Sequence, residues 1–91
     1  MQIVRRTLYG LVTLRALSRL PPGAAVAAPE LARRNGLPRA FLQLILIDLR
    51  RHGLVDSRRG QRGGYRLARP AAAGTVGEVI RALQGPLRVA P

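Results

Sequence analysis

The chain has 91 residues and no cysteine, which excludes disulfides, thiolate metal sites and cysteine-ligated iron–sulfur clusters within these residues. Its 16 basic residues are all arginine and face only 4 acidic residues, for a net charge of +12. Because such an excess disfavours the compact state, a polyanionic partner is expected. Nucleic acid is favoured over an anionic membrane, since no basic amphipathic helix with aromatic anchors is present.

The length predicts a single domain over residues 1–91. Hydrophobic residues make up 47% of the chain and recur periodically, which is typical of a folded domain. No apolar run approaches the ~20 residues that a membrane span requires, and the first residues do not resemble a secretory signal. We therefore expect a soluble, cytoplasmic protein that does not bind membranes.

The first predicted helix covers about residues 4–20, where apolar residues recur at helical spacing. A Pro-Pro-Gly run then ends it, and residues 24–27 are either extended or loop. Arg5 and Arg6 at the helix start either contact the DNA backbone or are simply solvated. Tyr9 lies next to the apolar stripe and is expected in the core.

The next two predicted helices form a helix-turn-helix. Pro29 suits the first turn of a helix that ends near Gly36, and Pro38 opens a longer helix over about residues 39–52. A short helix, a tight turn and a longer helix in succession are typical of this DNA-binding motif. His52 near the end of the longer helix is expected to be a charge partner of the helix C-terminus.

Residues 54–70 predict two short strands around a turn. The turn contains three glycines and three arginines: Gly60, Gly63, Gly64, Arg58, Arg59 and Arg62. The glycines permit positive φ and close backbone approach, and only Asp56 balances the arginines nearby. The hairpin is therefore predicted to be the wing of a winged helix, in contact with the groove and phosphates of duplex DNA; the alternative is a solvated hairpin.

A last helix is predicted over residues 76–83, because Thr75 and Glu78 can form a capping box at its start. The fold class is therefore mostly α with a small β-hairpin (α+β). The expected architecture is a winged helix-turn-helix with three helices, a two-stranded wing and one further helix.

The third helix has an apolar face and an opposite face of mixed character. Its apolar face is predicted to be core: Leu42, Ile45, Leu46 and Leu49. Gln43 on the opposite face can bond an adenine edge, and Arg39, Arg50 and Arg51 can hold phosphates. Leu44 and Ile47 share this face with Ala40 but cannot form side-chain hydrogen bonds. They either touch thymine methyl groups or pack against another protein surface, and both interpretations stay open.

An enzyme is not expected. The four acidic residues are scattered over separate elements: Glu30, Asp48, Asp56 and Glu78. There is no nucleophile–base pair, no metal-ligand cluster and no phosphate-binding loop ahead of a helix. The sequence therefore predicts no cofactor, no metal and no small-molecule ligand.

Motifs along essentially the whole chain resemble the Rrf-two family of bacterial winged-helix regulators, to which IscR, NsrR and CymR belong. They are Pro29-Glu30-Leu31-Ala32 with Gly36-Leu37, Phe41-Leu42, Gly63-Gly64-Tyr65, Leu67-Ala68-Arg69-Pro70 and Gly85-Pro86. The resemblance implies a homodimeric, sequence-specific transcriptional regulator that acts as a repressor at a palindromic element of double-stranded DNA. It also implies a recognition helix in the major groove and a wing in the minor groove.

Carried over by position, the implied contacts are Ala40, Gln43 and Leu44 on the helix and Arg59, Gly60 and Gln61 on the wing. The family's cysteine loop and dimerisation helix, expected beyond Gly85-Pro86, are not found, so no iron–sulfur cluster is predicted. The full predicted DNA-binding set is Arg5, Arg6, Arg39, Ala40, Gln43, Leu44, Ile47, Arg50, Arg51, Arg58, Arg59, Gly60, Gln61 and Arg62. The alternative functions are a protein-interaction adaptor, or a DNA-binding fragment with only nonspecific affinity.

Overall fold

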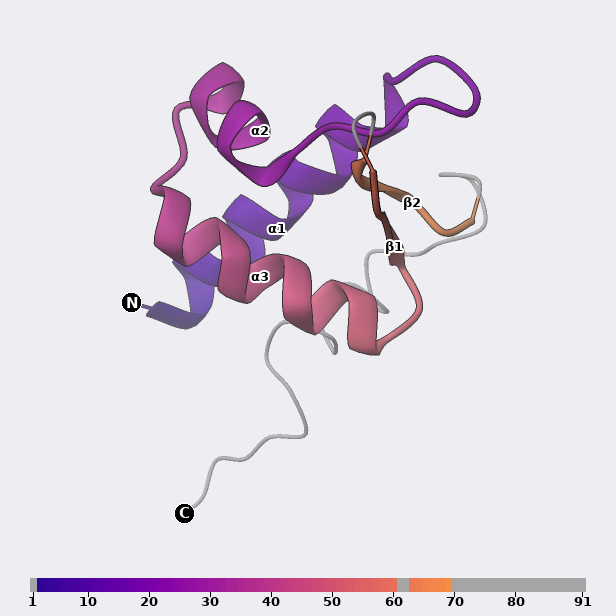
Figure 1. The fold of residues 1–91 in the computed structure, drawn as a ribbon. Helices are drawn as coiled ribbons and strands as arrows, with labels where there is room; N and C mark the ends of the chain where they lie inside the picture. Colours follow the sequence, from indigo (N-terminus) through magenta and orange to yellow (C-terminus); the bar gives the residue numbers. More distant parts are fainter. Residues whose placement is uncertain (1, 61–62, 70–91) are drawn as a thin grey trace.

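The computed structural model describes residues 2–60 and 63–69 (Figure 1). Three helices, α1 (Gln2–Ser18), α2 (Ala28–Asn35) and α3 (Arg39–Arg51), precede an antiparallel hairpin of β1 (Val55–Arg58) and β2 (Gly64–Leu67). The predicted order of three helices and a two-stranded wing is confirmed. The further helix predicted over residues 76–83 lies outside the described residues.

The first helix ends at Ser18, earlier than the predicted end at Leu20. The amides of Arg19 and Leu20 donate to the carbonyls of Ala16 and Leu17, each at 3.2 Å. These bonds span three residues instead of four, so the chain tightens into a turn before the two prolines. Among residues 2–60 and 63–69, no helix is long and apolar enough to cross a membrane.

The ends of α2 and α3 lie close to the proline and glycine residues that were predicted to mark them. Gly36 has a left-handed φ of 63°, and its amide donates to the carbonyl of Ala32 at the end of α2. The carbonyl of Pro38 accepts the amide of Leu42 at 2.9 Å, which starts α3. The helix ends at Arg51, and the ring Nδ1 of His52, the C-cap residue, lies 3.0 Å from the carbonyl oxygen of Asp48.

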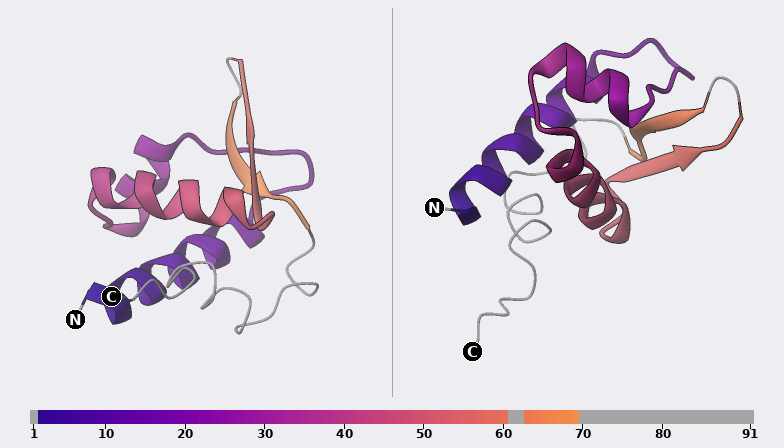
Figure 2. Two further views of the ribbon diagram at one scale, coloured as in Figure 1. Left: turned by 90° about the horizontal axis from the view of Figure 1, so that it is seen from below. Right: turned by 60° about the vertical axis from the view of Figure 1, so that its left-hand side comes forward.

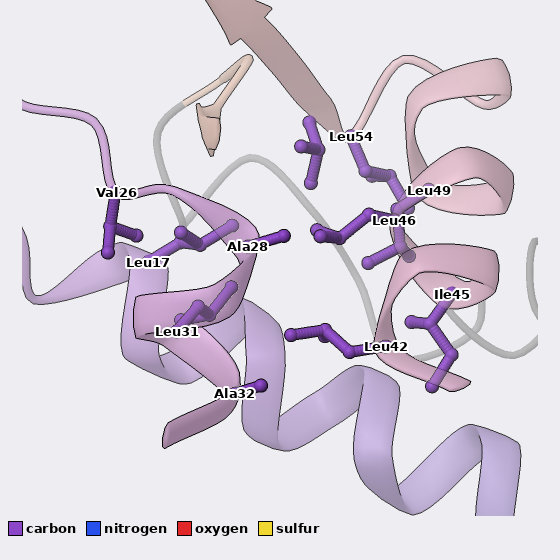
Figure 3. Packing of buried hydrophobic residues seen from close by; sticks show 11 residues of the cluster. Leu17, Val26, Ala28, Leu31, Ala32, Leu42, Ile45, Leu46, Leu49 and Leu54 are labelled. Atoms are coloured by element: carbon purple, nitrogen blue, oxygen red, sulfur yellow. The ribbon is translucent and has the colours of Figure 1, made fainter. Parts of the chain in front are cut away.

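The hydrophobic core lies between the three helices and the base of the hairpin. Figure 3 shows the buried side chains of α3 facing Leu17 of α1 and Leu31 of α2. The four residues of the predicted apolar face are fully buried: Leu42, Ile45, Leu46 and Leu49. Tyr9 packs against this core and meets Phe41 edge-to-face at 5.4 Å between ring centroids. The predicted core face of α3 is therefore confirmed.

The hairpin extends from the C-terminal end of α3 and away from the helices, as both views of Figure 2 show. A segment far away in sequence holds it, because Val26 forms an isolated bridge to Tyr65. The amide of Val26 donates to the carbonyl of Tyr65 at 3.0 Å, and the amide of Tyr65 donates back at 2.7 Å. The extended alternative for residues 24–27 is therefore correct at Val26.

The glycines of the hairpin serve two purposes. Gly60 and Gly64 have positive φ, as predicted. Gly63 does not have a positive φ, and it is the predicted close approach of the backbone that applies there. A Cβ on Gly63 would instead lie 2.2 Å from the carbonyl oxygen of Arg58, so Gly63 is required by close packing of backbone across the turn.

Candidate nucleic-acid interface

The outward face of α3 is a continuous stripe opposite the core. Residues 40, 43, 44, 47, 50 and 51 recur at spacings of one, three and four, which places them on one side of a helix. All six are exposed, including two large apolar side chains, Leu44 at 54% and Ile47 at 46%. The stripe therefore presents one amide, two large apolar groups and two guanidinium groups to a partner.

The only acidic residue of α3, Asp48, is neutralised by an arginine of α1. Arg6 of α1 donates from its NH2 group to Oδ2 of Asp48, with 27% and 24% of the two side chains exposed. The sequence predicted that Arg6 contacts either the DNA backbone or solvent. In the structure its guanidinium group instead bonds to Asp48 and so links α1 to α3. Arg5 is exposed next to it.

We expect the Arg6–Asp48 pair to stabilise the position of α3 on α1. Asp48→Asn should lower the free energy of unfolding by about 1–2 kcal/mol, since a charged partner is removed from a mostly covered hydrogen bond. A double-mutant cycle with Arg6→Met, followed by urea denaturation, should return a coupling energy of about 1 kcal/mol. Strictly additive effects of the two substitutions would contradict the prediction.

A second acidic residue is bonded to two arginines of α2. Glu30 accepts hydrogen bonds from Arg33 at 3.0 and 2.6 Å and from Arg34 at 2.6 Å. The hydrogen bonds from Arg33 and then from Arg34 lower the pKa of Glu30 to about 2, and the same contact raises the pKa of Arg33. One of the two positive charges of α2 is thus balanced within the helix itself.

This pairing predicts a pH dependence. Because the folded pKa of Glu30 lies below its ordinary value of 4.5, its ionised form favours the folded state. The contribution is present above pH ~4.5 and disappears as the pH falls through the folded pKa of about 2. An NMR titration of the Glu30 carboxyl carbon should have its midpoint near 2, and Arg33→Ala should move it upward. A midpoint close to the ordinary value of 4.5 in the unmodified protein would contradict this.

One of the predicted wing arginines is bonded within the chain. The NH1 group of Arg58 donates to the carbonyl oxygen of Gly23 at 2.9 Å, which ties the hairpin to the loop between α1 and α2. Arg58 is thus an anchor of the wing as well as an exposed cation. Arg59 and Gly60 are exposed as predicted, while Gln61 and Arg62 lie outside the described residues.

Four exposed arginines of α3 and the wing have no ion-pair or hydrogen-bond partner for their side chains in the described part of the chain: Arg39, Arg50, Arg51 and Arg59. Arg50 and Arg51 line a hollow of about 290 Å³ between α3 and β2, together with Ile47 and Tyr65. Sequence reasoning did not include Tyr65 among the site residues. Its place directly after two glycines of the wing was the available clue, but strand alternation indicates only that it packs inward.

The family model described as Rrf2, iron-dependent transcriptional regulator, matches residues 3–91. The chain belongs to the Rrf2 family. It is 36% identical over 90 residues to an rrf2-like HTH-type transcriptional regulator of Rhodobacter capsulatus, covering 99% of this chain and 60% of that protein. An HTH-type transcriptional regulator of Mycobacterium tuberculosis is 37% identical over 87 residues, 96% of this chain and 54% of that protein.

Solved structures of Rrf2 regulators have the same fold. CymR of B. subtilis, the global cysteine regulator, superposes with a TM-score of 0.82 at 32% identity, over 94% of this chain and 67% of that one. T. potens IscR gives a TM-score of 0.82 at 35% identity, over 93% of this chain and 62% of that one. The winged-helix architecture is thus shown, within a family of transcriptional regulators and not of enzymes. The chain spans about 60% and 54% of the two curated Rrf2 relatives described above.

The description of the Rrf2 family implies iron. The residues present do not supply a site for it: within residues 2–60 and 63–69 no group of three or more His, Cys, Asp or Glu side chains could hold a metal ion. The 91 residues also contain no cysteine, the thiolate ligand that iron–sulfur clusters require. The donor set of these residues therefore does not fit an iron centre.

Proposed function

We propose that this chain is a DNA-binding transcriptional regulator, and that its 91 residues form one winged helix-turn-helix domain. The observation that carries the proposal is the surface formed by the outward stripe of α3 and the adjoining wing. That surface carries four exposed arginines whose side chains have no ion-pair or hydrogen-bond partner in the described part of the chain, while the acids Asp48 and Glu30 are neutralised by other arginines. Unbalanced guanidinium groups beside an exposed helix are suited to phosphates that flank a groove.

The recognition helix α3 would enter the major groove. Gln43 would bond an adenine edge, and Leu44 and Ile47 would touch thymine methyl groups, so the readout favours A·T pairs. Arg59 on the wing would enter the minor groove, where a narrow A-tract attracts arginine. The proposed contacts are Arg5, Arg39, Ala40, Gln43, Leu44, Ile47, Arg50, Arg51, Arg59 and Gly60, with Gln61 and Arg62 added from the sequence alone.

Assembly and mode of action complete the proposal. A homodimer acting as a repressor would bind a palindromic site in the cytoplasm, because two-fold symmetry in the protein matches dyad symmetry in its operator. The support is membership of the Rrf2 family and the likeness to CymR and IscR. Arg6 and Arg58 are assigned to positioning α3 and the wing, because both guanidinium groups bond within the protein.

The proposal is tested by selection of the purified chain against a random duplex pool at about 0.15 M salt, near the physiological value. Enrichment of a dyad-symmetric element would support a dimeric regulator that reads sequence. Enrichment of a single half-site would support sequence reading without the dimer. Duplex DNA bound no more tightly than heparin, with no enriched sequence, would contradict the proposed function.

A protein-interaction adaptor is the second candidate, favoured by the exposure of Leu44 and Ile47, at 54% and 46%. Such apolar groups on a helix also suit a groove in a protein partner. The double variant Leu44→Arg with Ile47→Lys separates the two functions. It should abolish an apolar protein interface, whereas it should raise nonspecific DNA affinity and remove sequence preference if α3 reads DNA.

A further inference from the structure

The hollow between α3 and β2 combines three kinds of group. Arg50 and Arg51 supply two guanidinium groups from the last turn of α3, Ile47 supplies an apolar wall, and Tyr65 lines it from the wing. Among the described residues, neither arginine has an ion-pair partner and the Tyr65 hydroxyl has no hydrogen-bond partner. Two cations and an unused hydroxyl around a space of about 290 Å³ suit a small anion.

The place of the hollow identifies that anion. The hollow lies at the junction of the recognition helix and the wing, between an element proposed for the major groove and one proposed for the minor groove. Adjacent major and minor grooves of a duplex are separated by one sugar–phosphate strand. If α3 and the wing enter neighbouring grooves, that strand must cross their junction.

We infer that the hollow between α3 and β2 binds one phosphodiester of this crossing strand, with Tyr65 donating its hydroxyl to a phosphate oxygen beside Arg50 and Arg51. The inference rests on the proposed function and adds a residue to it. Tyr65 is well held for this purpose, because its backbone is bonded to Val26 and its ring packs against the core. A donor fixed in this way loses little conformational freedom on binding.

The test compares Tyr65→Phe with Tyr9→Phe, the same change at the only other tyrosine of the chain. Both variants keep the ring, so packing is preserved and equal melting temperatures are expected. Tyr65→Phe should weaken binding to a duplex from the selection by about tenfold, the effect of one hydrogen bond to a charged group. The slope of affinity against salt should stay unchanged because the hydroxyl carries no charge. Tyr9→Phe should bind like the unmodified protein, since Tyr9 packs against Phe41.

Phosphate-ethylation interference on the same duplex locates the contact. In the unmodified protein, ethylation of one phosphate between the major-groove and minor-groove contacts should block binding. In Tyr65→Phe the sensitivity should be reduced at that phosphate alone, because Arg50 and Arg51 still contact it. Unchanged affinity in Tyr65→Phe would overturn the inference, and so would weaker binding with an unchanged interference pattern, since that indicates a purely structural role. Failure of the unmodified protein to bind any duplex would instead overturn the proposed function.

Discussion

Replacement of Gly64 by alanine is expected to detach the wing and to lower the free energy of unfolding by about 3 kcal/mol, as overpacking and backbone strain act together. Gly64 has a φ of +141°, which side-chain-bearing residues rarely adopt. A Cβ there would lie 2.3 Å from the carbonyl carbon and oxygen of Val26. Because those atoms are backbone, the clash cannot be relieved by rotating a side chain. The two hydrogen bonds between Val26 and Tyr65 should therefore break.

Gly36→Ala is the matched control for this change. Gly36 also has a positive φ, of +63°, but a Cβ there would meet nothing within 4 Å. Gly36→Ala should lower the free energy of unfolding by only about 1 kcal/mol, which is the strain of an alanine in the left-handed conformation. Chemical denaturation gives both values, and hydrogen exchange at the Val26 and Tyr65 amides should lose protection in Gly64→Ala alone. Equal destabilisation by the two variants would show that Val26 does not hold the wing.

Removal of two arginines from the end of α3 should have the largest effect on DNA binding. Arg50→Ala with Arg51→Ala should reduce the log–log dependence of affinity on salt by ~0.9, because both guanidinium groups face the one phosphate of the hollow. At about 0.15 M salt, the lost neutralisation and the lost charge-assisted hydrogen bonds together should weaken binding by about 30-fold or more. Both side chains are exposed and lie outside the core, so the melting temperature should change little.

The control for charge is Arg15→Ala with Arg19→Ala, which changes the net charge by the same amount. Arg15 lies in the last turn of α1 and Arg19 directly follows that helix, and both are exposed outside the proposed surface. Their removal should leave the salt slope within ~0.2 of the original, since neither arginine is expected to neutralise a phosphate. Equal slopes for the two double variants would mean that net charge alone governs binding, and would contradict a DNA surface on α3. Fluorescence anisotropy over a series of salt concentrations measures both.

Elements held by local interactions were predictable from the sequence. The helices follow apolar spacing, and proline and glycine mark their ends, because these residues constrain their own backbone. The buried face of α3 follows from the helical period alone, since a helix that packs on one side must place its apolar residues there. The small errors at Leu20 and His52 occur where the last helical turn tightens, which depends on backbone bonds and not on residue type.

The candidate surface was predictable only in part. The exposure of Leu44 and Ile47 and of the arginines of α3 follows from the same helical period. The helical period could not indicate that Arg6 bonds to Asp48, 42 positions away, or that Arg58 bonds to Gly23, 35 positions away. The sequence pattern around an arginine is the same whether its guanidinium meets a carboxylate of its own chain or a phosphate. The tertiary arrangement therefore decided which arginines are bonded within the protein and which stay exposed without such a bond.

The charge of this protein could be read from its sequence, and so could the three helices of its described residues, the hairpin and the core face, because each of these elements depends on residues that are close along the chain. Tertiary structure alone decided how the wing is held and where Tyr65 lies. Val26 is bridged to β2, and Tyr65 lines the hollow beside Ile47, only because the hairpin and the helices are placed against one another. Such contacts depend on the packing of whole elements, and packing is set by the shape of the complete core and not by any local pattern.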